Sequence, residues 1–236
     1  RKSVNLSKQY HIIASNIDQA VLVATVTQPN TLNEFIDRFL VSVTAYNIPA
    51  VILVNKLDVY EDEHLHRLAD WNSIYTNAGY TILPISVEKE INLDKVKKLF
   101  QGKTTVLSGN SGVGKSSLLK KLLPNEDITV KEISEMHQQG VHTTTFAEMY
   151  DLPNGGHLID TPGIRGIGIV DIKPEELSNY FPEFLKLKLS CKFNNCVHIN
   201  EPNCAVKTAL GKGQIALSRY NSYLRIFNND QEENYR

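Results

Sequence analysis

The sequence lacks the features that mark secreted and membrane proteins. It has 3 cysteines among 236 residues, and all of them lie between Cys191 and Cys204. An odd number in one short segment excludes a fully paired disulfide scaffold. No run of about 18 uncharged apolar residues is present, and no signal-peptide pattern is found, so we expect no membrane-spanning helix. These absences favour a reducing, cytoplasmic location and no membrane partner.

An excess of charge of one sign is missing too. The 25 basic and 26 acidic residues give a net charge of −1, so any surface that attracts nucleic acid must be local. Apolar residues make up 42% of the chain and charged residues 22%, which excludes a disordered, collagen-like or coiled-coil protein. Because the chain begins with Arg1 and not with Met, we expect it to be a piece of a longer protein.

Short aliphatic runs alternate with longer amphipathic segments. Strands are expected at residues 21–26, 50–55, 81–86, 104–109, 146–152 and 157–160. Helices are expected at residues 32–45, 61–78, 93–99, 116–123, 174–185 and 214–227. This alternation predicts an α/β fold with a mostly parallel sheet covered by helices on both faces. The last two strands, joined by a Pro-Asn-Gly-Gly turn, predict an antiparallel hairpin. The pattern changes near residue 170, so we predict domains at 1–170 and 171–236.

A phosphate-binding loop is the clearest motif. The segment Gly-Asn-Ser-Gly-Val-Gly-Lys-Ser matches G-x-x-x-x-G-K-[ST] between a predicted strand and a predicted helix, the context that this motif requires. Glycines let main-chain N–H groups approach phosphates, Lys115 reaches their oxygens, and Ser116 offers its hydroxyl to Mg²⁺. A merely glycine-rich turn is disfavoured by this context. The expected nucleotide-binding residues are Gly109, Asn110, Ser111, Gly112, Val113, Gly114, Lys115, Ser116 and Ser117.

A D-x-x-G sequence, Asp160-Thr161-Pro162-Gly163, follows a short predicted strand. Asp160 can hold Mg²⁺ through water, and the main-chain N–H of Gly163 can sense a γ-phosphate. Alone, this pattern is an ordinary turn signal. Beside a phosphate loop, the nucleotide interpretation is the better one.

The sequence Asn55-Lys56-Leu57-Asp58 ends another predicted strand. A carboxylate at Asp58 can accept both N1–H and the 2-amino group of guanine, which adenine does not offer, so GTP is selected over ATP. Ser86 begins a loop after the next strand, where a further contact with the base is expected. A plain strand-to-loop junction explains Ser86 equally well.

Threonines lie between the phosphate loop and Asp160, in Gly140-Val141-His142-Thr143-Thr144-Thr145. A threonine there can complete Mg²⁺ coordination when the γ-phosphate is present. Thr144 is the chosen ligand, with Thr143 and Thr145 as alternatives. A β-rich run leading into a strand accounts for one or two of the three.

The order of these motifs carries further information. Ras-like GTPases run from the phosphate loop through the threonine and D-x-x-G to N-K-x-D, whereas here N-K-x-D comes first. Cutting such a fold between its third and fourth strands and joining the old ends gives this order. A compact α/β domain tolerates such a cut because its termini are often close together. The order predicts a circularly permuted P-loop GTPase fold.

The sequence therefore resembles the circularly permuted ribosome-assembly GTPases of the RsgA (YjeQ) family. The likeness runs from residues 14–19 to the final predicted helix, which carries Arg219, Tyr220, Tyr223 and Leu224. Its markers are the segments 55–58, 109–117, 140–145, 160–165 and 181–184, together with the cysteine cluster.

The resemblance implies a GTP hydrolase that uses GTP, GDP and Mg²⁺. It implies action late in maturation of the small (30S) ribosomal subunit, stimulation by that subunit, and contact with its rRNA. Family members also carry an N-terminal OB-fold domain, which is absent from this sequence, in keeping with a chain that starts at Arg1.

The catalytic group is a separate question. In Ras-like enzymes a glutamine directly after D-x-x-G orients the attacking water, but Ile164 stands there and can neither donate nor accept a hydrogen bond. Unassisted hydrolysis should therefore be slow. His142 is the internal candidate for positioning water, beside Lys115 and Thr144. A solvated loop histidine is the competing interpretation.

A candidate zinc site lies near the end of the chain. Cys191, Cys196, His198 and Cys204 supply three thiolates and one imidazole within fourteen residues, a closed Cys₃His set of the structural type. A disulfide fails on the odd count, and free buried cysteines leave His198 unexplained. The sequence predicts a small C-terminal helical domain held together by Zn²⁺.

Basic residues surround this cluster and can form a face that binds rRNA phosphates; a solvated helix face explains them equally well. They are Lys186, Lys188, Lys192, Lys207, Lys212, Arg219 and Arg225. Two other functions remain open. A nucleotide-gated rRNA-binding module with incidental hydrolysis fits Ile164, and a P-loop ATPase or small-molecule kinase is disfavoured by Asp58.

Overall fold

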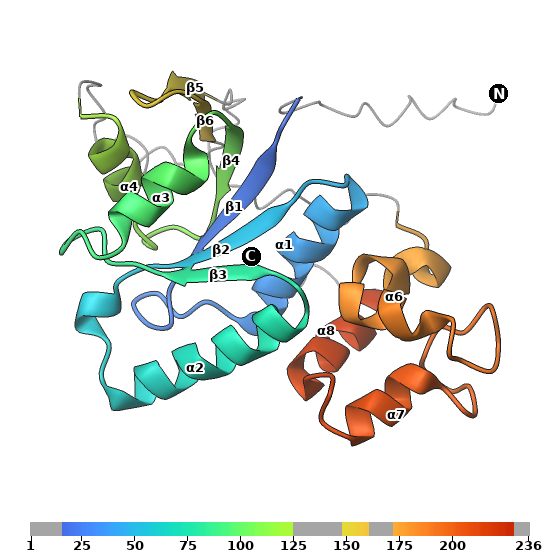
Figure 1. Ribbon diagram of the computed structural model, residues 1–236. Coiled ribbons are helices and arrows are strands. Elements are labelled where there is room, and N and C mark those ends of the chain that lie inside the picture. Colours follow the sequence, from blue (N-terminus) through green and yellow to red (C-terminus); the bar gives the residue numbers. More distant parts are fainter. Residues whose placement is uncertain (1–15, 125–147, 161–171, 229–236) are drawn as a thin grey trace, which may run out of the picture.

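The computed structural model describes residues 16–124, 148–160 and 172–228. Its centre is a six-stranded sheet in the order β3-β2-β1-β4-β6-β5 (Figure 1). The strands are β1 (Gln19–Ala24), β2 (Ala50–Val54), β3 (Thr81–Pro84), β4 (Thr104–Ser108), β5 (Glu148–Asp151) and β6 (His157–Asp160). Neighbouring strands are parallel except β5 and β6, which are antiparallel. The mostly parallel sheet and the hairpin agree with the expectation from the sequence.

Helices follow most of the strands. The longer elements are α1 (Asn33–Ala45), α2 (Asp62–Asn77), α3 (Leu93–Phe100) and α4 (Lys115–Leu122). The C-terminal elements are α6 (Pro182–Lys188), α7 (Ala205–Gly211) and α8 (Leu217–Phe227), and the 3₁₀ helices are η1 (Leu57–Val59) and η2 (Pro174–Tyr180). None of the helices in the described ranges is both long and apolar enough to cross a bilayer.

Both faces of the sheet are covered. The alternating residues of β1 divide between two cores, because successive side chains of a strand point to opposite faces. Val21 and Val23 pack with side chains of α3 and α4, such as Phe100. Leu22 packs with side chains of α1 and α2, such as Trp71. Strands covered in this way carry almost no polar side chains, which is why β1 and β2 read as continuous apolar runs.

The sheet order brings together segments that are far apart in the sequence. The first three strands of the chain form one half of the sheet, and the last three form the other. The two halves meet where β1 pairs with β4, with Leu22 opposite Ser108. In a parallel sheet the loops that follow the strands gather at one edge. The loops after β1, β2, β3 and β4 therefore meet there with the end of β6, although these segments are far apart in sequence.

The C-terminal helical part (residues 172–228) has a separate apolar core. Phe181, Phe184 and Tyr223 lie in it, and α1 contributes Val41. The single helix expected at 174–185 is in fact divided into η2 and α6 at Phe181. Pro182 at the first position of α6 explains the division, because proline has no N–H to continue the preceding helix. The short helix α7 was not anticipated.

Candidate functional site

The phosphate loop (residues 109–116) joins β4 to α4, as expected. Two of its glycines have no room for a side chain. A Cβ on Gly109 would lie 2.2 Å from the carbonyl oxygen of Val23, and one on Gly114 would lie 2.3 Å from Nδ2 of Asn55. Both also have positive φ angles, +143° and +98°, which L side chains rarely adopt. The loop is thus held against β1 on one side and the loop after β2 on the other.

Lys115 begins α4 and folds back over its own loop. Its Nζ donates hydrogen bonds to the carbonyl oxygens of Gly109 and Asn110, at 2.6 and 2.8 Å. Burial lowers the pKa of this amine, and the nearby Asp160 carboxylate opposes that shift. Asp160 is itself buried at the end of β6, opposite Leu107 of β4. The structure therefore brings the phosphate-loop lysine and the D-x-x-G aspartate together.

Asn55 connects three of the predicted segments. Its Nδ2 donates to the carbonyl oxygen of Val113 in the phosphate loop at 2.9 Å, and its Oδ1 accepts the N–H of Val87 at 3.1 Å. The side chain is buried, so both polar atoms find partners inside the protein, as buried amides require. The N-K-x-D motif is thereby fastened to the phosphate loop and to the loop after β3.

Asp58 and Ser86 are also brought together. The Ser86 hydroxyl donates a hydrogen bond to Oδ1 of Asp58. The same hydroxyl oxygen accepts the main-chain N–H of Lys89 at 3.0 Å. Ser86 is fully buried, whereas Asp58 is exposed. This arrangement orients the carboxylate through one oxygen while leaving it accessible to a ligand.

A further loop at this edge was missed by the sequence analysis. The β1–α1 loop (residues 25–32) lies between the phosphate loop and the N-K-x-D motif. The Nζ of Lys56 donates to the carbonyl oxygen of Gln28, and a Cβ on Gly112 would lie 3.5 Å from the ring of Pro29. No motif marks this loop. Its position after a buried parallel strand, at the edge where ligands bind, was the available signal.

Tyr60 joins the same loop to the N-K-x-D motif. Its hydroxyl donates to the carbonyl oxygen of Asn55 at 2.6 Å and accepts the N–H of Val26 at 2.8 Å. Burial raises the pKa of Tyr60 to about 12, so the hydroxyl remains a neutral donor at physiological pH.

Several predicted site residues lie outside the described residues. These are Gly163, Ile164, His142 and the three threonines Thr143, Thr144 and Thr145. Of the predicted Mg²⁺ ligands, Ser116 and Asp160 are therefore the two that the described ranges contain.

The cysteine cluster comes together as the sequence predicts. The ligand atoms of Cys191, Cys196, His198 and Cys204 all lie within 4.8 Å of one another. Nδ1 of His198 lies 3.3 Å from Sγ of Cys204 and 3.6 Å from Sγ of Cys191. The two sulfurs are 4.0 Å apart, close to the roughly 3.8 Å spacing of a tetrahedral site with 2.3 Å metal–sulfur bonds. The geometry suits a four-coordinate ion.

The chemistry of these donors fits a metal as well. Burial raises the pKa of Cys196 to about 12 and also raises that of Cys204, so the thiols would stay neutral without a cation. A divalent ion supplies the positive charge that converts them to thiolates. Nδ1 of His198 faces the sulfurs, while its buried Nε2 has no hydrogen-bond partner among the described residues.

Side chains nearby hold the cluster loop in place. The Glu201 carboxylate accepts main-chain N–H groups of Val197, Ile199 and Asn200 at 2.6, 2.9 and 3.1 Å. These bonds outweigh the effect of burial and lower the pKa of Glu201. Tyr220 donates to the carbonyl oxygen of His198 at 2.7 Å. The main chain around the imidazole is therefore fixed from two sides.

Comparison with known proteins decides the family. The family model described as RsgA GTPase matches residues 1–170. The chain belongs to the RsgA GTPase family. A curated relative, the small ribosomal subunit biogenesis GTPase RsgA of Flavobacterium johnsoniae, is 54% identical over 236 residues, which are 100% of this chain and 72% of the relative.

Solved structures agree with this assignment to the RsgA family. The crystal structure of YjeQ from Thermotoga maritima matches with a TM-score of 0.78 and 36% identity, over 91% of this chain and 71% of that one. YloQ, described as a circularly permuted GTPase, matches with a TM-score of 0.76 and 36% identity, over 93% and 71%. The circularly permuted GTPase fold predicted from the motif order is confirmed.

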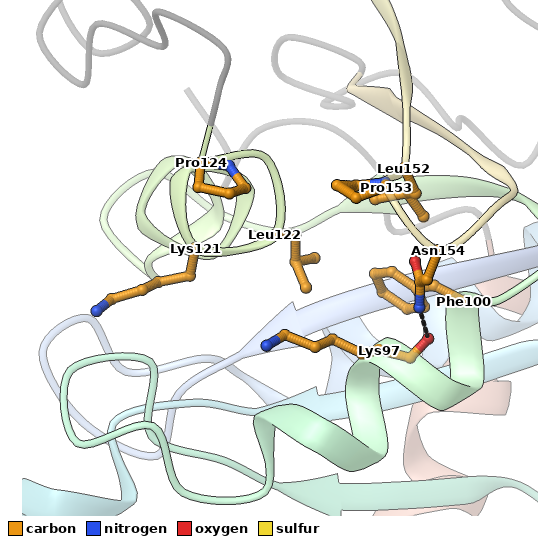
Figure 2. A pocket seen from close by; sticks show the side chains of 8 residues that line it. All are labelled: Lys97, Phe100, Lys121, Leu122, Pro124, Leu152, Pro153 and Asn154. Carbon is orange, nitrogen blue, oxygen red and sulfur yellow. Dashed lines mark hydrogen bonds between the residues drawn. The ribbon is translucent and has the colours of Figure 1, made fainter.

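One pocket of this RsgA-family chain lies away from the nucleotide motifs. It has a volume of about 230 Å³ and lies between the last turns of α3 and α4 and the β5–β6 turn (Figure 2). Phe100, Leu122 and Leu152 form its apolar wall, and Lys97 and Lys121 extend at its rim. The phosphate loop meets α4 at the opposite end of that helix, so this pocket is separate from the nucleotide motifs.

The basic face expected around the cysteine cluster is smaller than predicted. Arg219 is not on the surface: it is buried between two carboxylates. Arg225 pairs with Glu34 of α1 at 2.6 Å. Arg219 therefore does not belong to the expected face, whereas Arg225 is exposed as expected but already has an acidic partner. Of the predicted lysines, Lys188 is half-buried, and the exposed ones are Lys186, Lys192, Lys207 and Lys212.

Proposed function

We propose that this protein is a GTP hydrolase that acts in biogenesis of the small ribosomal subunit. The observation that carries the proposal is the pair of bonds from Asn55, which joins the N-K-x-D motif to the phosphate loop in a chain of the RsgA family. That family's curated members at 46–54% identity are named small ribosomal subunit biogenesis GTPases.

Guanine is recognised by Asp58. Its exposed carboxylate accepts N1–H and the 2-amino group of the base, while Ser86 holds it from behind. Lys56 covers the base from the side of the β1–α1 loop. Adenine offers no matching pair of donors, so ATP would leave the oriented carboxylate without partners.

The phosphates bind in the loop at residues 109–116. The main-chain N–H groups and the start of α4 attract the anion. The Lys115 amine bonds to the carbonyl oxygens of Gly109 and Asn110 and therefore lies over the loop. When a nucleotide binds there, the amine exchanges these oxygens for the β- and γ-phosphate oxygens. The donors of Ser116 and Asp160 are oxygens, which suit Mg²⁺, an ion that neutralises phosphate charge when bound. Thr144 is the proposed third ligand.

Hydrolysis depends on a group other than the usual glutamine. The Ile164 side chain cannot hydrogen-bond to water, so we assign the positioning of the attacking water to His142, whose imidazole can do so and which lies in sequence beside the switch threonines. GTP turnover without a partner is accordingly slow.

The Cys₃His cluster holds Zn²⁺ in a structural role. Four protein ligands fill a tetrahedral shell and leave no open position for chemistry. The ion stabilises residues 171–236 as a small domain, in which α6, α7 and α8 are each only two to three turns long. The exposed lysines near it contact rRNA phosphates of the small subunit, in the cytoplasm.

The test is GTP turnover with and without small ribosomal subunits, with ATP as a competitor. We expect slow basal turnover, stimulation by the subunit, and no competition from ATP at equal concentration. Tight nucleotide-dependent binding to the subunit without stimulated turnover would instead support an rRNA-binding module with incidental hydrolysis.

A further inference from the structure

Arg219 is the most deeply buried charged side chain of the C-terminal helical part, with 1% of its surface exposed. Its Nε and Nη2 donate to the two oxygens of Glu183 on α6, at 2.7 and 3.1 Å. Its Nη1 donates to Oδ1 of Asp37 on α1, at 2.8 Å, and Asp37 has no exposed surface. One guanidinium therefore binds a carboxylate of its own part and another from the GTPase part.

Aromatic rings complete this environment from both parts. The guanidinium carbon lies 4.6 Å from the ring centre of Phe181, 5.7 Å from that of Tyr80 and 5.9 Å from that of Tyr75. Burial acts to lower the pKa of Arg219, but the two carboxylates outweigh it and hold that pKa well above its usual value. The side chain is charged, and its planar fork fixes the direction of each bond.

Stability alone does not account for such a group. Removing three charged groups from water offsets most of the attraction between them, and apolar residues of similar volume often fill such a space as well. A directional pair across two packed parts instead fixes their relative orientation.

From Asp37 the contacts continue to the nucleotide motifs. Asp37 lies one helical turn after Asn33, the first residue of α1. The Oδ1 atom of Asn33 accepts a hydrogen bond from the Trp71 indole N–H at 2.8 Å. Thr31 and Thr25 lie at the two ends of the β1–α1 loop. The main-chain N–H of Thr31 donates to the carbonyl oxygen of Thr25 at 3.0 Å. That loop carries the carbonyl oxygen of Gln28, which holds Lys56. A shift of α1 therefore moves the partner of the N-K-x-D lysine.

We infer that Arg219 is a positioning residue that couples binding at the C-terminal helical part to guanine-nucleotide affinity, by holding Asp37 and with it α1 and the β1–α1 loop. The inference rests on the proposed function, because the small subunit is the partner that engages the C-terminal part. Beyond that function, it names the structural element that connects the two binding sites. Coupling requires an element whose position depends on binding at both sites, and we assign this role to α1.

The test measures the affinity of the full chain for a fluorescent non-hydrolysable GTP analogue, with and without purified small subunits. In the wild-type protein we expect the subunit to change the Kd by about fivefold or more. In Asp37→Asn the change should fall below about twofold, while the Kd without subunits stays near the wild-type value. Glu183→Gln is the matched control, because Glu183 binds Arg219 within the C-terminal part, and it should keep the full change.

Arg219→Lys gives a second reading if Asp37→Asn does not fold. It keeps the charge, but its ammonium lacks the planar fork that directs Nη1 to Asp37 and Nε and Nη2 to Glu183. The variant should therefore lose the coupling, and adding Asp37→Asn should cause no further loss. Zinc content and thermal midpoint report folding.

Unchanged coupling in Asp37→Asn or Arg219→Lys, or equal loss in Glu183→Gln, would overturn the inference. Stimulated turnover without any affinity change in the wild type would overturn it and leave the proposed function standing. Absence of both stimulated turnover and any change in Kd with subunits would overturn both.

Discussion

The side-chain amide of Asn55 donates to the carbonyl oxygen of Val113 at 2.9 Å, across 58 positions of sequence. In a permuted chain these two motifs have exchanged their order, yet this bond joins them in the proposed nucleotide site. It also sets a steric limit, since a methyl group on Gly114 would meet the donor nitrogen.

The first prediction concerns this bond. Asn55→Ala removes the partners of the Val113 carbonyl and the Val87 N–H, at a cost of about 1–3 kcal/mol for buried groups. GDP affinity should fall by about 5- to 150-fold, measured by titration with a fluorescent GDP. Gly114→Ala should act in the same direction by displacing the Asn55 side chain.

The control for this pair is Gly211→Ala, at the end of α7, where an added Cβ meets nothing within 4 Å. It should bind GDP like the wild type. Wild-type affinity in Asn55→Ala would show that the bond to Val113 does not support the pocket.

The second prediction tests base recognition. Asp58→Asn replaces one acceptor by a donor, so it should weaken GDP binding by about 100-fold or more and improve binding of xanthosine diphosphate, whose 2-carbonyl accepts a hydrogen bond. Competition titrations with both nucleotides measure the change. Asp62→Asn, in the first turn of α2, is the matched control and should keep the guanine preference. An unchanged preference in Asp58→Asn would place the base elsewhere.

The third prediction concerns the metal. Metal analysis of the purified protein should give one zinc per chain, and a strong chelator should abolish the ordered C-terminal helical part. Cys204→Ser should lose zinc and lower the thermal midpoint, because the cluster loop then has three ligands. Ser190→Ala, next to the ligand Cys191, should retain zinc. A folded, zinc-free wild-type protein would contradict the assignment.

The fourth prediction addresses catalysis. His142→Ala should lower subunit-stimulated turnover by about 100-fold or more, the contribution of a positioned general base, and leave GDP affinity intact. Stopped-flow GTP hydrolysis with subunits present measures the first quantity and fluorescent titration the second. His66→Ala, on the exposed side of α2, serves as the control. Full stimulation in His142→Ala would remove this histidine from the mechanism.

Much of the fold followed from local patterns. The apolar runs at β1 and β2 are typical of strands covered on both faces, and the glycine-rich loop before Lys115 indicates a strand–loop–helix unit. The cysteine spacing predicted the cluster because its ligands lie within one short segment.

What the sequence did not reveal depends on distant contacts. The β1–α1 loop has no motif, and its role follows from the partners that Gln28 and Val26 find in Lys56 and Tyr60. Arg219 was counted as a surface cation because arginines are mostly exposed. Its place in the helix gave a signal, since Tyr223 and Ile226 follow it by four and seven positions and are buried on the same face.

Helix α1 contributes side chains to two separate apolar cores. Ile36 and Leu40 face the sheet, while Val41 enters the core of residues 172–228. A chain ending before residue 172 would therefore expose an apolar flank with the Asp37 carboxylate beside it, now without its cation. Such a truncated GTPase should self-associate through this flank, because in the intact chain the C-terminal part covers it.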